Sequence, residues 1–110
     1  MLRIIAIGVF FSLLPLLAGA QGSQAPMGFW ATQPPNEQLY VSPGGCKFVG
    51  TDGVTKIVIE GKCSWNPSSA GGILTIMNIH NYRPAPIYYN IIWVNSQQIK
   101  VEGDLFFKRN

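Results

Sequence analysis

From residue 21 onward, apolar runs of strand length alternate with clusters of turn residues, and this rhythm limits the possible folds more than any other feature. No segment keeps the i, i+3, i+4 apolar spacing of an amphipathic helix over three turns. Short runs punctuated by Gly, Pro, Asn and Asp every 8–12 residues or so are typical of all-β sandwiches and barrels. The expected strands are 28–33, 37–42, 46–49, 54–60, 73–79, 87–94, 98–102 and 105–109, and the fourth run allows a continuation through Trp65.

The connections between these runs are short. Pro43-Gly44 and Asp52-Gly53 are typical of tight turns, and short turns join neighbouring strands antiparallel. The sequence therefore predicts an antiparallel meander of about eight short strands. An open sheet of this kind would expose its edges and one apolar face, so we expect closure into a small barrel or a compact sandwich, with the barrel favoured.

Two runs, 73–79 and 87–94, are apolar on both faces. Strands of this type are usually buried on both sides. We therefore expect them to be central strands, or strands with a second covered surface.

The first twenty residues have the pattern of a secretory signal peptide. Arg3 precedes an apolar core of about 14 residues, and Ala18-Gly19-Ala20 fits the small-x-small cleavage rule. The core is shorter than the roughly 20 residues that span a bilayer. We expect cleavage before Gln21, a secreted or periplasmic product without a membrane span, and one small β domain over residues 21–110.

Cys46 and Cys63 both lie in the expected mature chain. An even cysteine count in an exported protein indicates a disulfide bond. A metal site is the alternative, but there is no second cysteine pair and His80 is the only histidine. We therefore predict one disulfide, no metal and no cofactor.

The inventory of reactive groups argues against an enzyme. A Ser/His/Asp arrangement would have to combine His80 with Ser68 or Ser69, and PSSAGG lacks the glycine that precedes the serine of a nucleophile elbow. Loss of Arg3 with the leader leaves seven Lys and Arg against five acidic residues, a net charge of +2. These basic residues are scattered, whereas a nucleic-acid surface shows a basic stripe.

Surface recognition remains as the expected activity. The proline-bounded loop 80–86 carries His80, Asn81, Tyr82 and Arg83, and Tyr88 follows it; aromatic and arginine side chains are enriched at binding hot spots. We expect Trp93 and one of Tyr88 and Tyr89 to belong to the core instead. The second long loop supplies a further set of candidates: Trp65, Ser68 and Ser69.

One short motif resembles a known family. Gly28-Phe29-Trp30 is similar to the opening motif of lipocalins, a resemblance that covers three residues. It implies a barrel in which Trp30 closes one end and meets a late basic residue, for which Arg109 is the candidate. The expected mature chain is about half as long as a lipocalin and has Thr51-Asp52-Gly53 where that family has Thr-Asp-Tyr.

From these observations we expect an exported, non-catalytic β-barrel recognition module, monomeric, that binds a protein partner through its surface loops and binds no nucleic acid. The alternatives are a lipocalin-like barrel that binds a small molecule or glycan, and a secreted hydrolase. Eight very short strands enclose an interior that their own side chains fill, which favours recognition on the outside.

Overall fold

The computed structural model describes residues 23–109, which form nine antiparallel strands and no helix. The strands are β1 (Gly28–Ala31), β2 (Gln38–Ser42), β3 (Gly45–Thr51), β4 (Lys56–Gly61), β5 (Cys63–Pro67), β6 (Gly71–Asn78), β7 (Ala85–Asn95), β8 (Gln98–Val101) and β9 (Asp104–Arg109). The predicted leader and its cleavage site lie outside the described residues. None of the described residues forms a helix long and apolar enough to cross a membrane.

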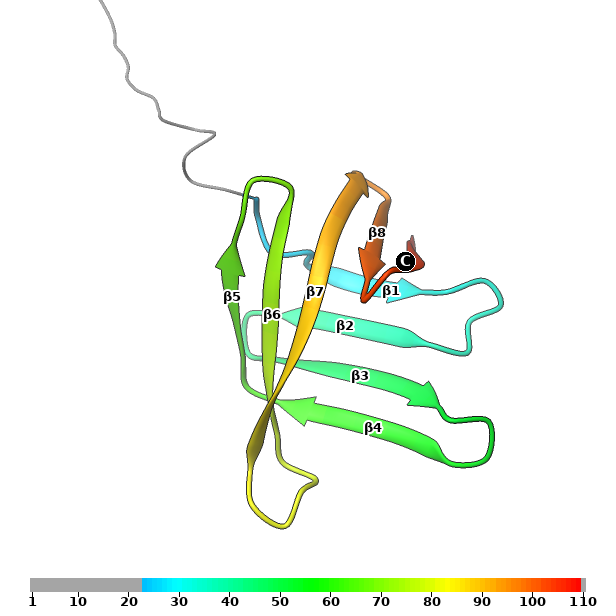
Figure 1. Cartoon of the computed structure of the whole chain (residues 1–110), viewed down its shortest axis with the longest axis vertical. Coiled ribbons are helices and arrows are strands. Elements are labelled where there is room, and N and C mark those ends of the chain that lie inside the picture. Colours follow the sequence, from blue (N-terminus) through cyan, green and yellow to red (C-terminus); the bar gives the residue numbers. More distant parts are fainter. Residues whose placement is uncertain (1–22, 110) are drawn as a thin grey trace, which may run out of the picture.

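All nine strands belong to one sheet in the order β4-β3-β2-β1-β9-β8-β7-β6-β5. Pairing of β1 with β9 joins the first and last strands and closes the sheet on that side. In Figure 1, β1 to β4 form one layer and β5 to β8 cross it at a steep angle. The predicted all-β architecture is therefore confirmed, as a nearly closed barrel-like sheet.

The sheet closes through a kink between β4 and β5. Amide N–H groups of Met77 and Ile79 donate to the carbonyl oxygens of Lys62 and Glu60, both over 2.8 Å. Gly61, between the two acceptors, has a φ of +156°, and a Cβ atom there would lie 1.8 Å from the Met77 carbonyl oxygen. Only glycine allows so close an approach. The fourth predicted run does continue through Trp65, but the kink divides it into two strands.

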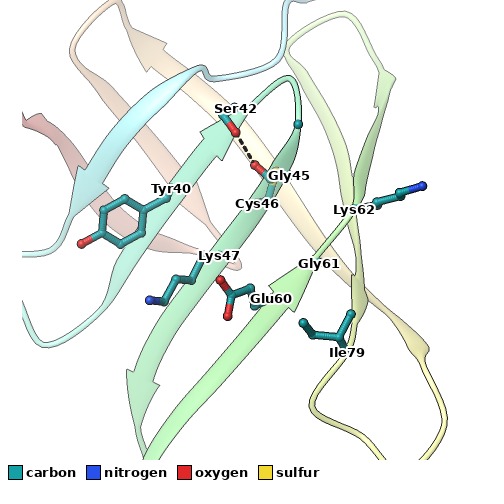
Figure 2. A pocket seen from close by; sticks show the side chains of 10 residues that line it. Tyr40, Ser42, Gly45, Cys46, Lys47, Glu60, Gly61, Lys62 and Ile79 are labelled. Atoms are coloured by element: carbon teal, nitrogen blue, oxygen red, sulfur yellow. Dashed lines mark hydrogen bonds between the residues drawn. The ribbon is translucent and has the colours of Figure 1, made fainter.

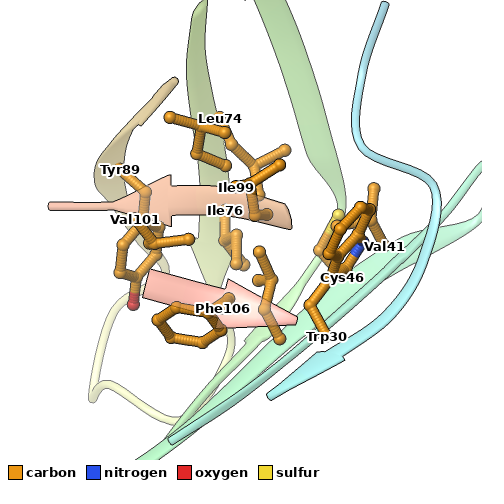
Figure 3. Packing of buried hydrophobic residues seen from close by; sticks show 11 residues of the cluster. Trp30, Val41, Cys46, Leu74, Ile76, Tyr89, Ile99, Val101 and Phe106 are labelled. Carbon is orange, nitrogen blue, oxygen red and sulfur yellow. The ribbon is translucent and has the colours of Figure 1, made fainter. Parts of the chain in front are cut away.

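Alternation along the strands builds the core. One face of each layer contributes the buried side chains Trp30, Leu39, Val41, Leu74, Ile76, Ile91, Ile99 and Phe106 (Figure 3). Tyr89 is buried beside them, with its ring 5.0 Å from that of Phe48, while Tyr88 points outward. One of the two tyrosines thus belongs to the core, as expected.

The predicted disulfide is present between Cys46 and Cys63, which are 17 residues apart and have Cα atoms 5.7 Å apart. It links β3 to the first residue of β5, immediately after the kink. Because Cys46 also pairs with Gly61 in the β3–β4 ladder, the disulfide fixes the strand at the place where it changes partners.

Segment 23–27, which precedes β1, is held by all three tryptophans. The indole N–H groups of Trp30, Trp65 and Trp93 donate to the carbonyl oxygens of Pro26, Ser23 and Gln24, over 2.9, 2.8 and 2.9 Å. We call residues 23–27 the clasp segment, because these three bonds fasten it to strands from both layers.

The basic residue that meets Trp30 is Lys108, whose Nζ lies 5.6 Å from the ring centroid. Arg109, the candidate from the lipocalin resemblance, instead pairs with Phe29 and is wrong in that role. The cause is strand alternation: successive residues of β9 point to opposite faces, so only one of Lys108 and Arg109 can reach Trp30.

The last turn differs from the expected strands 98–102 and 105–109. The last hairpin turns at Glu102 and Gly103, with φ angles of 51° and 88°, one residue earlier than those strand bounds imply. Two successive residues with positive φ match the twist of the flanking strands.

Candidate functional site

The loop between β6 and β7 has a fixed base built around Asn78, which is 3% exposed. Its Oδ1 accepts hydrogen bonds from the backbone N–H groups of Glu60 and His80, each over 3.2 Å. Its Nδ2 donates to Oδ1 of Asn81 over 3.0 Å. A buried amide that makes three hydrogen bonds holds its surroundings in one arrangement. Asn78 therefore ties the start of the loop to the end of β4.

His80 adds a second link to the same strand, since its Nε2 lies 3.1 Å from Oε1 of Glu60. Both side chains are about half exposed, so the pair contributes well under about 1 kcal/mol to stability. The contact orients His80 along the surface and does not make it part of a reactive cluster.

Tyr82 and Arg83 occupy the tip of this loop. The Tyr82 side chain is 98% exposed, and no described residue forms a hydrogen bond or ion pair with the Arg83 side chain. Both are flanked by the base at Asn78 and by the start of β7 at Ala85, which pairs with Asn78. The loop therefore exposes two large side chains, while hydrogen bonds and strand pairing fix its two ends.

Tyr88 lies farther along β7 on the outer surface and is 63% exposed. It pairs with Thr75 of β6, and the next outward pair toward the loop is Met77 with Pro86. Ile73 and Ile92 extend the same surface in the other direction, and both are exposed. We call Ile73, Met77, Tyr88 and Ile92 the outer apolar face.

The outer apolar face explains why β6 and β7 are apolar on both sides in sequence. The strands are central in their half of the sheet, as predicted, but no described residue covers their second surface. Contiguous exposed apolar surface is a common mark of an interaction site. Sequence reasoning missed Ile73, Met77 and Ile92, although their two-sided pattern was the available signal.

A shallow groove of about 520 Å³ lies on the other side of the loop base, over β2, β3 and β4 (Figure 2). Tyr40, Lys47 and Glu60 project from neighbouring strands along it, with Ile79 at the far end. The Tyr40 ring stacks on Phe29 with centroids 4.3 Å apart, which fixes its orientation.

The other predicted candidates are engaged within the chain. Trp65 is half-buried against the core and donates to Ser23, as described above. The backbone N–H of Ser23 donates to the carbonyl of Ser68 over 3.0 Å, and its hydroxyl lies 3.4 Å from the carbonyl of Ser69. The structure thus places Trp65, Ser68 and Ser69 against the clasp segment, at the opposite end of β6 from His80.

This separation rules out a catalytic triad that combines His80 with Ser68 or Ser69. The eight residues of β6 lie between Ser69 and His80 and span about 25 Å at the usual strand rise. A nucleophile and its base must come within hydrogen-bond reach. Residues 23–109 also contain no group of three His, Cys, Asp or Glu side chains that could hold a metal ion.

One carboxylate pair was not anticipated. Glu37 and Asp104 face each other in an open hollow of about 610 Å³, where partial burial first, and then the Asp104 charge, raise the pKa of Glu37. Glu37 lies in the β1–β2 loop and Asp104 is the first residue of β9, so no local spacing in the sequence predicts the pair.

Comparison of the chain with protein-family models, with curated proteins and with solved structures finds no match.

Proposed function

We propose that this protein is an exported, non-catalytic β-barrel module that recognises a protein partner through the β6–β7 loop and the surface beside it. The observation that carries the proposal is the contrast within that loop. Its base is fixed by the buried Asn78 network, whereas Tyr82 at its tip is almost completely exposed. A large side chain on a rigid base loses little conformational entropy on binding, which is how hot-spot residues act.

Recognition on the outside is also favoured by the filled interior. Trp30, Phe106 and Leu39 are fully buried in the barrel, and the hollows among the described residues open to the exterior. The disulfide fits an extracytoplasmic setting, since such bonds persist in oxidising compartments.

The test is capture of partners from the native extracellular or periplasmic fraction, followed by affinity measurement with purified partner. We expect the double variant Tyr82→Ala/Arg83→Ala to weaken binding about thirtyfold, which corresponds to about 2 kcal/mol. Its melting temperature should stay close to that of the wild type, because loop-surface substitutions usually change stability by less than about 0.5 kcal/mol.

A matched control is Ser96→Ala/Gln97→Ala in the β7–β8 turn, which removes two exposed side chains from another loop. It should bind as the wild type does. Equal affinity of the wild type and the Tyr82/Arg83 variant would remove the loop from the recognition surface.

A second candidate is a small polar ligand or glycan in the shallow outer groove. Tyr40 is held flat against Phe29 beside Lys47 and Glu60, an arrangement in which a ring and polar groups converge. Titration with oligosaccharides should then shift the amide resonances of Lys47 and Glu60, and Tyr40→Ala should abolish the shifts. Unchanged spectra at millimolar sugar would eliminate this candidate.

A further inference from the structure

The outer edge of β4 has backbone groups without a partner strand. Glu60 directs both its N–H and its C=O away from β3, to Asn78 Oδ1 and to the N–H of Ile79. Backbone groups alternate sides along an antiparallel strand. Val58 and Lys56 therefore point their N–H and C=O groups to the same side as Glu60, past the point where β6 ends.

No described residue bonds to these outward groups of Val58 and Lys56. The hydrogen bonds of Ile79 to Glu60 and of Met77 to Lys62 show that β6 runs antiparallel to the end of β4. If β6 continued in line, residues 81 and 83 would pair with Val58 and Lys56. Instead the chain turns away after Ile79 and forms the β6–β7 loop near the end of β4 (Figure 1).

Apolar surface lies beneath the same edge. Ile57 and Ile59 point to the inner face of the sheet, where Ile59 packs on the core while Ile57 remains 40% exposed. The residue paired with Ile57 on β3 is Gly50, which has no side chain to cover it. An added strand would place a side chain over Ile57.

We propose that the β4 edge at Lys56 and Val58 binds an extended segment of the partner protein as an additional antiparallel strand. Alternating N–H and C=O groups along a strand edge are satisfied together only by another extended backbone, the mode known as β-augmentation. Lys56 lies at the open end of the edge and favours a segment with an acidic residue opposite it.

A second copy of this chain fits the edge less well. Glu60 is already bonded to the end of β6, so two β4 edges could pair only over residues 56–58. A foreign segment can run past this stretch and also contact Tyr82 and Arg83 on the adjoining loop. The inference deepens the proposed function and rests on it, since it names the form in which the partner is recognised.

The test uses mature protein with its disulfide intact and a phage-displayed library of random linear peptides. Peptides selected on the wild type are titrated against Val58→Pro, which removes the outward N–H and leaves the bonds to β3 in place. We expect Val58→Pro to weaken binding at least tenfold. The control Val58→Thr keeps the N–H on a β-branched side chain and should bind as the wild type does.

Amide hydrogen exchange of the wild type gives a second measurement that does not depend on the fold of the proline variant. In the free protein, the Lys56 and Val58 amides should exchange faster than those of Ile57 and Ile59, which bond to β3. A bound peptide should slow the exchange of Lys56 and Val58 selectively.

The outcomes separate the two proposals. If binding depends on Tyr82 and Arg83 but leaves the Lys56 and Val58 amides unprotected, the edge inference is wrong and the loop proposal stands. If a bound peptide protects these amides but the Tyr82/Arg83 variant binds as the wild type does, the edge inference stands and the loop proposal is wrong. If no peptide from the library slows the exchange of the Lys56 and Val58 amides, the inference is wrong. It is also wrong if these amides are protected because the protein self-associates, which analytical sedimentation would show.

Discussion

Replacement of Gly61 by alanine should open the seam that closes the sheet. A Cβ atom there would stand 1.8 Å from the Met77 carbonyl oxygen, whereas carbon–oxygen contacts normally begin near about 3.3 Å. The strands would have to part by roughly 1.5 Å, which breaks the two 2.8 Å bonds on either side of Gly61. Two lost bonds cost about 2 kcal/mol, and the unfavourable φ adds about 1–2 kcal/mol. We therefore expect a loss of about 3–4 kcal/mol.

Gly53→Ala provides the matched control. Gly53 also has a positive φ, +94°, but nothing lies within 4 Å of the position of its Cβ. This variant shares the conformational cost without the collision, so it should lose only about 1–2 kcal/mol. Urea unfolding followed by tryptophan fluorescence measures both. If Gly61→Ala loses no more stability than Gly53→Ala, the seam is not held by close approach at Gly61 and the account of closure is wrong.

Three further perturbations probe other parts of the fold. Replacing both Cys46 and Cys63 by alanine should lower the free energy of unfolding by about 3 kcal/mol, from the entropy of the 17-residue loop; unfolding in urea that is unchanged by the substitutions would contradict this. Burial raises the pKa of Tyr89 from 10.0 to about 12, so stability should be intact below pH 10 and fall as the pH rises from 10 to 12. The Tyr89→Phe variant should lose less stability over that interval in alkaline unfolding scans, and an equal loss would contradict the assignment. Trp93→Phe removes the indole donor to Gln24 and should cost about 1 kcal/mol and speed proteolysis within the clasp segment; unaltered cleavage there would show that the bond does not hold it.

Local patterns predicted the strands because each pattern has a local cause. Alternation at 56–60 and 98–102 and the Asp52-Gly53 turn specify hairpins without help from distant residues. In the turn, the Asp52 carboxylate accepts hydrogen bonds from the N–H groups of Val54 and Thr55, as its position predicts. The disulfide followed from counting cysteines.

The kink and the clasp segment depend on contacts between distant residues and leave no such pattern. Gly61 looks like any glycine until the Met77 carbonyl is placed against it. The bonds of Trp65 and Trp93 to the clasp segment span 42 and 69 residues, and their acceptors are backbone carbonyls, which every residue possesses. Side-chain chemistry at Ser23 and Gln24 therefore carried no information about them.

The candidate site divides in the same way. Exposure of Tyr82 and Arg83 followed from the prolines and polar residues of their own loop. Burial of Asn78 did not, because a polar residue at the end of an apolar run looks like the beginning of a turn. Only the structure shows that its amide bonds to a strand 18 residues earlier.

Closure of the sheet and the vacant edge of β4 have one cause. Residues 56–67 act as a single bent strand that pairs first with β3 and then with β6, so each half keeps one edge unpaired.

Proteins usually cover unpaired strand edges. On the β5 side the clasp segment lies against Trp65 and the loop after it: the Ser23 N–H donates to the Ser68 carbonyl, and the Trp65 indole N–H donates to the Ser23 carbonyl. On the β4 side the chain departs after Ile79 and leaves the edge open at Val58 and Lys56. The bend at Gly61 closes the barrel, and the departure of the chain after Ile79 leaves the β4 edge beyond Glu60 without a partner strand. A partner strand on β4 would extend the antiparallel pairing that β6 makes with β4 only as far as Glu60.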